Sequence, residues 1–245
     1  MALYSEVFPP DFGLSKGALP VRVIPRRSGR PTMPGRFPTK KGTLDSLRGE
    51  TNLEMDGFGH FEVNPRCRLM AAQPHRLHFE EHVPGRGTKI RTYVPDLAIR
   101  MDDGRVAVVD FKLAKYAMLP KWKARADVLT RCYADRGAVF STVTSDVLRI
   151  EPRASNVRVM LQRRPWHMDA EAEAAVDAAI AILGLPATVA AIAAKAALSQ
   201  PHPHTDRAFS RIVEMAILGL VTLELDKRLG PGTVVGSAPA RAPLP

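Results

Sequence analysis

Residues 93–112 read YVPDLAIRMDDGRVAVVDFK, and this stretch decides the fold. Its two apolar segments flank Asp102-Asp103-Gly104, a sequence typical of the turn in a β-hairpin. It therefore predicts two neighbouring strands over residues 90–100 and 105–112. Residues 106–109 are apolar on both faces, which is typical of a central strand that is covered on both sides.

Three charged side chains of this stretch are placed to act together. Asp110 and Lys112 are two residues apart in one strand, so both face the same side of the sheet. Asp96, from the neighbouring strand, could reach the same point. Two carboxylates can hold Mg²⁺, or Mn²⁺ as an alternative, and a lysine beside them can orient a water or stabilise charge on a phosphate. The alternative is a solvated aspartate and a surface Asp–Lys pair.

The flanking sequence places these strands in a mixed α/β domain. A loosely helical spacing over residues 43–63 ends at Asn64-Pro65, because a residue before proline avoids the helical region. Leu77 and Phe79 suggest a strand, residues 120–136 a helix with a basic side, residues 138–142 a short buried strand, and residues 157–161 another strand. The order of these elements predicts one domain over residues 44–165.

The composition changes after Trp166. Residues 169–198 are rich in alanine and predict two helices, broken at residues 184–186, with Thr188 capping the second. Thr205-Asp206 opens a third helix. Apolar segments on either side of Gly230-Pro231-Gly232 predict a hairpin. Three helices and a hairpin predict a small helical domain over residues 166–236 that is compatible with a winged helix. Residues 237–245 predict a disordered tail.

The net charge of +10, from 35 Lys and Arg against 25 Asp and Glu, favours a polyanionic partner, and DNA is the commonest one. Residues 1–43 are rich in Pro, Gly and basic residues and predict an extended basic arm, either lying on phosphates or solvated. We expect a cytoplasmic protein without a membrane partner, because no apolar run reaches ~18 residues and no signal-peptide pattern is present. The candidate nucleic-acid contacts are Arg36, Lys40, Lys41, Lys121 and Lys123.

The order of several short motifs resembles the TnsA-type endonuclease subunit of heteromeric transposases, within the PD-(D/E)xK nuclease superfamily. The resemblance covers roughly residues 20–165 and extends more loosely to the helical end. Val143-Thr-Ser-Asp146 and Asn156 resemble the closing strands of that family. The other motifs that carry the resemblance are Gly35-Arg-Phe-Pro-Thr-Lys40, Glu50-Thr-Asn-Leu-Glu54, Asn64-Pro65, Gln73-Pro74, Tyr93-Val-Pro-Asp96 and Asp110-Phe-Lys112.

The resemblance implies a restriction-endonuclease-like fold that cuts the 5′ ends of a transposon. A partner transposase of the integrase type would cut and join the 3′ ends, with an ATPase regulator as a further partner. By position, Asp96 and Asp110 would be the main metal ligands, Lys112 the catalytic lysine and Glu54 the acidic residue of the first helix. Glu54 is preferred to Glu50 because its distance from Asn64-Pro65 fits the spacing of the family. The family often has Glu or Gln in place of Asp110, and Val in place of Phe111.

Two other functions remain open from the sequence. The chain could be a non-catalytic DNA-binding or adaptor module with a nuclease-like fold, in which case the side chains of Asp96, Asp110 and Lys112 could diverge. It could also be a free-standing restriction or repair nuclease of the same fold, which a requirement for a partner protein would exclude.

Overall fold

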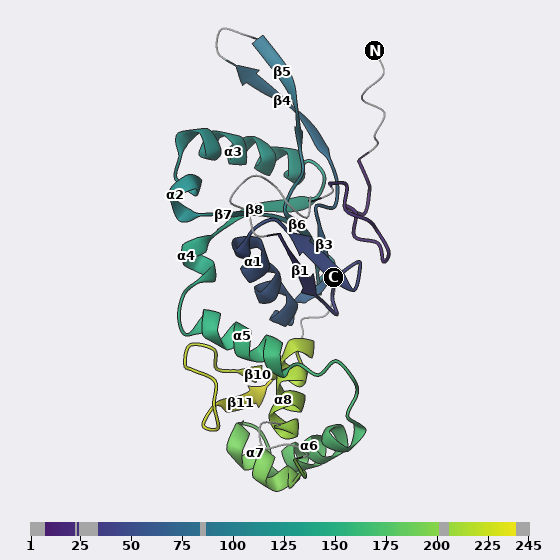
Figure 1. Cartoon of the computed structure of the whole chain (residues 1–245), viewed down its shortest axis with the longest axis vertical. Helices are drawn as coiled ribbons and strands as arrows, with labels where there is room; N and C mark the ends of the chain where they lie inside the picture. Colours follow the sequence, from purple (N-terminus) through teal and green to yellow (C-terminus); the bar gives the residue numbers. More distant parts are fainter. Residues whose placement is uncertain (1–7, 23, 25–33, 84–86, 201–205, 239–245) are drawn as a thin grey trace. The chain divides into compact units, whose positions relative to one another are not determined.

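The computed structural model describes residues 8–22, 24, 34–83, 87–200 and 206–238. The chain divides into two compact units: residues 1–62 with 66–148, and residues 63–65 with 149–245. Strands and helices occur in both, so the chain belongs to the mixed α/β class (Figure 1). The division after residue 148 comes earlier than the boundary at residue 165 that the change in composition predicts.

A four-stranded sheet forms the centre of the first unit, in the order β3 (Cys67–Ala72), β6 (Leu97–Met101), β7 (Val106–Lys112) and β8 (Ala138–Thr144). The pairs β3–β6 and β6–β7 are antiparallel, and β7–β8 is parallel. The hairpin of β6 and β7 and the central position of β7 are therefore confirmed.

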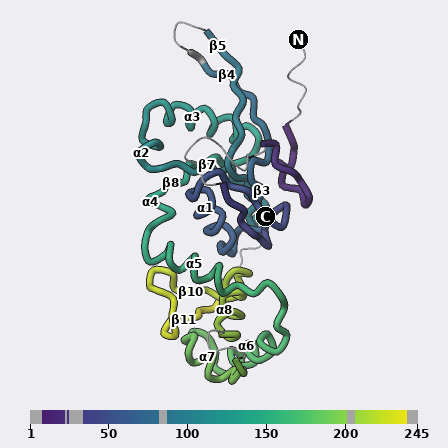
Figure 2. The backbone as a smooth tube through the Cα atoms, viewed as in Figure 1, coloured from purple at the N-terminus to yellow at the C-terminus, as the bar shows by residue number. Residues whose placement is uncertain are grey.

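Helices cover both faces of this sheet. Leu129 and Tyr133 of α3 (Pro120–Ala134) share one buried apolar cluster with Val108 of β7. On the opposite face, the ring of Phe58 in α1 (Asn52–Val63) lies 6.1 Å from the ring of Phe111, centroid to centroid. Val108 and Phe111 point to opposite faces because they are three positions apart, and successive side chains of a strand alternate between its faces. Figure 2 traces the backbone of these strands together with α1 and α3.

The first helix is shorter than the sequence predicts. Residues 46–49 form β2 (Ser46–Gly49), which pairs with β1 (Gly35–Pro38) in an antiparallel ribbon. The helix begins only at Asn52, where the hydroxyl of Thr51 accepts a hydrogen bond from the backbone N–H of Glu54 at 3.2 Å. The Thr51-x-x-Glu54 spacing is that of a capping box, a start signal that the apolar spacing alone does not contain.

The expected extended arm over residues 1–43 is wrong in part, because the first unit buries some of its side chains and residues 35–38 form β1, whereas Lys16 and Leu19 are exposed. Phe12 and Leu14 are buried in the core of the first unit. Buried His75 fixes this segment, because its Nδ1 contacts the carbonyl oxygen of Phe12 at 2.9 Å and its Nε2 contacts the hydroxyl of Tyr133 at 2.9 Å. Residues 1–7, 23 and 25–33 of the expected arm lie outside the described residues.

The expected strand over residues 90–100 is two strands in different sheets. Its first half belongs to β5 (Gly87–Tyr93), which pairs with β4 (Leu77–Val83) in a separate two-stranded ribbon (Figure 1). Its second half is β6. Pro95 lies between them and has no N–H to donate to a ladder, so the chain leaves one sheet there and enters another.

The second unit has the element order α5 (Arg153–Arg163), α6 (Ala170–Leu183), β9 (Ala187–Thr188), α7 (Val189–Ala196), α8 (Arg207–Leu218), β10 (Val221–Leu223) and β11 (Val234–Ser237). The expected hairpin of β10 and β11 is confirmed, and β9 adds a third strand. Thr188 and Asp206 cap α7 and α8 as expected, each accepting a bond from the N–H three residues on. Ser237 ends β11, and residues 239–245 of the expected tail lie outside the described residues.

The strand expected at residues 157–161 is wrong, because these residues lie in α5. Val157 and Met160 are both buried and three apart, which is a helical spacing. Asn156, in the same helix, donates to the carbonyls of Leu225 at 2.9 Å and Lys227 at 2.7 Å. Asn156 thus lies in a helix, not in a closing strand.

The motif at residues 143–146 is only partly a strand as well. β8 ends at Thr144, and the next two residues of the motif begin α4 (Ser145–Leu148).

Candidate active site

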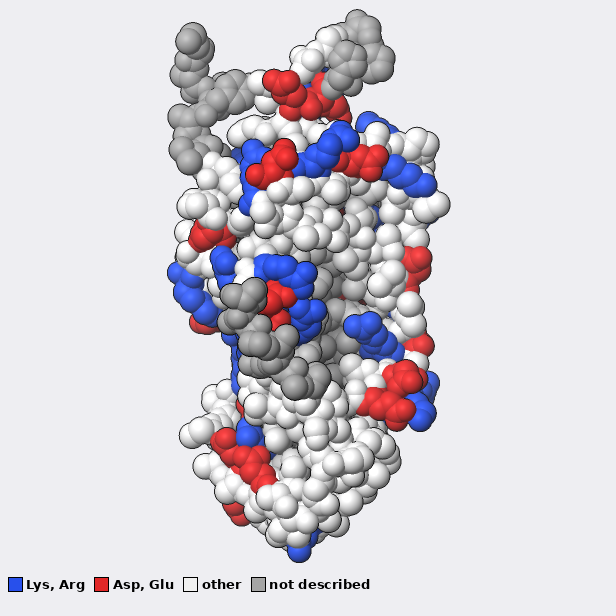
Figure 3. All heavy atoms as spheres, turned by 180° about the vertical axis from the view of Figure 1, so that it is seen from behind, with Lys and Arg blue, Asp and Glu red and all other residues white. Residues whose placement is uncertain are grey.

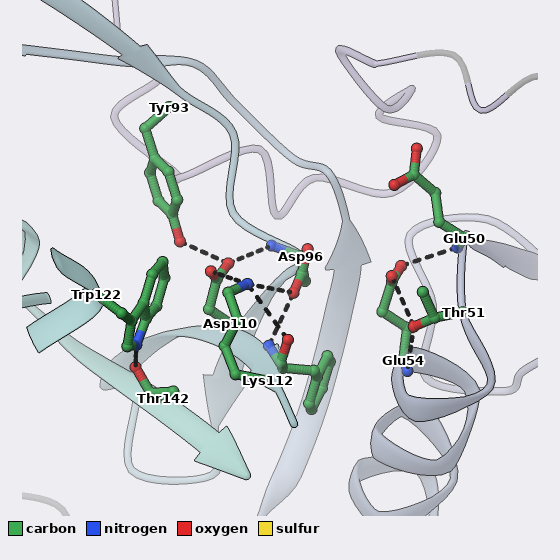
Figure 4. Close-up of polar contacts among 10 residues, drawn as sticks. Glu50, Thr51, Glu54, Tyr93, Asp96, Asp110, Lys112, Trp122 and Thr142 are labelled. Atoms are coloured by element: carbon green, nitrogen blue, oxygen red, sulfur yellow. Dashed lines mark hydrogen bonds and ion pairs between the residues drawn. The ribbon is translucent and has the colours of Figure 1, made fainter. Parts of the chain in front are cut away.

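The register of β6 and β7 brings two aspartates together. Leu97 pairs with Val109, so Asp96 lies opposite Asp110. The Oδ2 of Asp96 accepts the backbone N–H of Phe111 at 2.8 Å, and the backbone N–H of Asp96 donates to the Oδ1 of Asp110 at 3.3 Å (Figure 4). These reciprocal bonds hold the two carboxylates side by side at the end of the hairpin.

Lys112 extends its ammonium group into this pair. Its Nζ lies 2.7 Å from the Oδ2 of Asp110, 3.9 Å from the Oδ2 of Asp96 and 3.3 Å from the carbonyl oxygen of Phe111. One positive charge is therefore surrounded by oxygens of three residues. The structure thus brings together the three side chains that the sequence singled out on these strands (Figure 4).

Two aromatic residues complete the site, and sequence reasoning did not assign them to it. The hydroxyl of Tyr93 donates to the Oδ1 of Asp110 at 2.6 Å. The ring of Trp122, on α3, lies 4.5 Å from the Nζ of Lys112, and its Nε1 donates to the Oγ1 of Thr142 at 3.2 Å. Tyr93 belongs to the motif that contains Asp96, but nothing in the sequence pairs Trp122 with Lys112.

Glu54 is oriented away from this group. Its Oε1 accepts the hydroxyl of Thr51 at 3.0 Å and its Oε2 accepts the backbone N–H of Glu50 at 3.0 Å. Figure 4 shows its carboxylate turned toward the start of its own helix, apart from Asp96 and Asp110. Its present hydrogen bonds are those of a helix cap, although its charge still acts on Asp96 and Lys112.

The electrostatics of the site reflect two carboxylates and one ammonium in a confined space. Burial and the neighbouring charge of Asp110 raise the pKa of Asp96 well above its usual range. Burial opposes the charged form of Lys112, but the charges of Asp110 and Asp96 outweigh it and raise the lysine pKa. Burial and the charge of Asp110 raise the pKa of Tyr93, so its hydroxyl stays protonated and donates. With both aspartates ionised the group would carry a net negative charge, which favours a further cation.

The oxygens present fit a hard divalent cation. The ammonium of Lys112 already marks a point at which a cation is surrounded by carboxylate and carbonyl oxygens, the donors that Mg²⁺ and Mn²⁺ prefer. Within the described residues, the Oδ1 of Asp96 accepts no hydrogen bond, so it is available as a ligand. Within the same residues, no group of three or more His, Cys, Asp or Glu side chains lies close enough to hold a metal ion by itself. Waters and phosphate oxygens would therefore complete the coordination, as is usual for Mg²⁺.

The expected nucleic-acid contacts lie on two parts of the first unit. Arg36 is exposed in β1 and donates to the Oγ of Ser46 at 2.9 Å, and Lys40 and Lys41 follow that strand. Lys121 and Lys123 are exposed at the start of α3, on either side of Trp122. On the face drawn in Figure 3, basic and acidic side chains are interspersed among the coloured atoms.

Comparison of the sequence with known protein families and with curated proteins found no significant match in either. The function of the chain must therefore be inferred from its own residues.

In the part of the chain that the structure describes, no helix is both long enough and apolar enough to cross a membrane.

Proposed function

We propose that the chain is a metal-dependent DNA endonuclease of the PD-(D/E)xK type. The observation that carries the proposal is the convergence of Asp96, Asp110 and Lys112 at the end of a β-hairpin in a mixed sheet. A sheet with a helix on each face also fits a restriction-endonuclease-like fold. The net charge of +10 fits a polyanionic substrate.

Each side chain has a role that follows from its position. Asp96 and Asp110 would hold Mg²⁺, or Mn²⁺, through their carboxylates. A bound divalent cation would lower the pKa of a coordinated water and offset charge on the scissile phosphate. The ammonium of Lys112 would orient the attacking water or stabilise negative charge on the phosphate oxygens. Tyr93, bonded to Asp110, would fix the orientation of that carboxylate.

We further propose that this nuclease cleaves the 5′ ends of a transposon together with an integrase-type transposase, with an ATPase regulator as a further partner. The order of motifs that resembles the TnsA-type subunit, over roughly residues 20–165, supports this assignment. The element order of the second unit, α6, β9, α7, α8, β10, β11, is compatible with a winged helix, which would add a DNA-binding surface.

Two observations favour the alternative of a non-catalytic DNA-binding module. The ammonium of Lys112 is already paired with Asp110, and the carboxylate of Glu54 is engaged by its own helix. Such a module needs no metal, so a measurement of metal binding distinguishes it from the proposed endonuclease. A free-standing nuclease would share the metal site, and only the dependence of cleavage on a partner transposase separates it from the proposed enzyme.

Calorimetry with Mg²⁺ and with Mn²⁺, in the presence of duplex DNA, tests the proposal. We expect the full-length wild type to bind the ion and the Asp96→Ala/Asp110→Ala variant to lose that binding. The matched control is Asp127→Ala/Asp135→Ala, which removes two exposed carboxylates from α3 and the residue that follows it. Equal binding by the wild type and both variants at millimolar metal would reject the nuclease and favour the non-catalytic module.

A further inference from the structure

A segment of nine residues, 113–121, connects two residues of the candidate site, Lys112 and Trp122. The segment begins with Leu113, directly after the lysine, and ends with Lys121, directly before the tryptophan whose ring lies 4.5 Å from the Nζ of Lys112. Both ends of the 113–121 segment are therefore anchored at the candidate active site. It contains α2 (Ala114–Ala117), which Figure 1 shows at one end of α3, outside the sheet.

The 113–121 segment exposes apolar side chains that the first unit does not cover. The exposed fraction is 38% for Leu113, 49% for Tyr116, 65% for Met118 and 49% for Leu119. None of the four residues of α2 is buried. Contiguous exposed apolar groups of this kind mark interaction sites more often than scattered single ones do.

The charges around these apolar side chains identify the kind of partner. Lys115, Lys121 and Lys123 are exposed, and residues 113–126 contain no Asp or Glu. An apolar protein partner would not need a surround of cations, whereas phosphates on either side of a base step would. Met, Leu and Pro are among the side chains that DNA-bending proteins insert between base pairs, and all three occur together at Met118-Leu119-Pro120.

We propose that the 113–121 segment is a wedge that opens a base step of duplex DNA beside the scissile phosphate. Met118 and Leu119 enter the step, and Lys115, Lys121 and Lys123 hold the phosphates that flank it. Because the segment starts directly after Lys112, insertion would place the unstacked nucleotide near the side chain that is proposed to contact the phosphate. This inference rests on the proposed nuclease function and adds to it the part of the chain that deforms the DNA.

Fluorescence anisotropy without divalent ions measures the affinity for DNA under conditions in which the proposed cleavage cannot occur. Two labelled duplexes of 16 base pairs are compared, one fully paired and one with a central mismatch. Unstacking costs a few kcal/mol per step, so the wild type should bind the mismatched duplex about tenfold more tightly. Met118→Ser/Leu119→Ser should reduce this preference to near unity. The matched control Leu19→Ser/Val139→Thr changes two exposed apolar residues elsewhere in the first unit and should keep it.

Lys115, Lys121 and Lys123 should contribute to the affinity for both duplexes and not to the preference for the mismatched one. Lys115→Gln/Lys121→Gln/Lys123→Gln should weaken binding of both duplexes equally and lower the salt slope by about 3, roughly 1 for each lost phosphate contact. A wild type that binds both duplexes with equal affinity, or an unchanged preference in Met118→Ser/Leu119→Ser, overturns the wedge and leaves the apolar surface to a protein partner. A wild type that binds neither duplex overturns the wedge and the DNA endonuclease together.

Discussion

The ammonium of Lys112 lies 4.5 Å from the centre of the Trp122 ring, while it also contacts the carboxylate of Asp110 at 2.7 Å. The indole is itself fixed, because its Nε1 donates to the hydroxyl of Thr142 on β8. Lys112 is therefore held between an aromatic face on one helix and a carboxylate on its own strand. A flexible side chain with four rotatable bonds gains a defined position from these two contacts.

Replacing Trp122 should reduce cleavage through the position of Lys112. A cation–π contact contributes ~0.5–2 kcal/mol, so Trp122→Leu should lower the cleavage rate about 2- to 30-fold, with Trp122→Phe in between. A second readout needs no cleavage. In a Trp166→Phe background Trp122 is the remaining tryptophan, and Lys112→Met should change its emission. Unchanged emission would mean that the ring does not hold the ammonium.

Removing a charged group of the site should abolish cleavage without abolishing DNA binding. In the proposed mechanism, Asp96→Ala removes a metal ligand and Lys112→Ala removes the charge beside the phosphate, so we expect losses of at least about 100-fold in each. Asp110→Glu keeps a carboxylate one methylene longer and should retain part of the activity. Plasmid cleavage in Mn²⁺ with the partner transposase, alongside anisotropy with DNA, separates the two effects. Cleavage retained by either alanine variant would refute the site assignment.

The sequence predicted the hairpin and its charged residues because these depend on local patterns. A turn sequence between apolar segments fixes the pairing of two strands, and the strand period of two places Asp110 and Lys112 on one face. The register then puts Asp96 opposite Asp110. None of these steps requires knowledge of residues distant in the sequence.

Features that depend on distant contacts were missed. Trp122 reaches Lys112 only because α3 packs on the sheet, and His75 fixes the segment around Phe12 across 63 residues of sequence. The spacing of a motif assigns Glu54 to the site, whereas the Thr51-x-x-Glu54 capping box assigns its carboxylate to the start of the helix. That box explains the present orientation of the carboxylate.

Gly57 should be intolerant of a side chain because of Phe111. A Cβ at Gly57 would lie 2.1 Å from the ring of Phe111. Gly57→Ala should therefore destabilise the protein by ~1–3 kcal/mol despite the higher helix propensity of alanine, since the buried ring must move. Phe111→Val removes the ring, so the Gly57→Ala/Phe111→Val variant should be more stable than the sum of the two single effects predicts. Additive losses in urea unfolding would mean that the helix and the ring do not clash.

Buried His75 should make the stability depend on pH. Burial lowers its pKa to about 4 in the folded chain, against about 6.5 for an ordinary histidine. Between these values the unfolded chain binds a proton that the folded chain does not, so stability is lost as the pH falls from about 6.5 to about 4, by ~3 kcal/mol in total.

Urea unfolding gives the free energy of unfolding of the wild type and of His75→Gln at each pH across this range. The free energy of the wild type minus that of the variant should fall by ~1.4 kcal/mol for each unit by which the pH is lowered. His167→Gln, at an exposed position, should not change the slope. An NMR titration of the His75 ring in the wild type serves if His75→Gln does not fold, and a midpoint near 6.5 would contradict the prediction.

Glu54 should prove to be a helix cap rather than a ligand. Its two carboxylate oxygens accept bonds from Thr51 and from the backbone of Glu50. Glutamine serves the same role in a capping box, so Glu54→Gln should change the stability by less than ~0.5 kcal/mol. Glu54→Ala should cost ~1 kcal/mol. If the carboxylate is not a ligand, Glu54→Gln should also bind Mn²⁺ and cleave within about threefold of the wild type, about 0.7 kcal/mol in barrier height. A stable Glu54→Gln variant that no longer binds the ion would show that the carboxylate turns toward Asp96 when metal is bound.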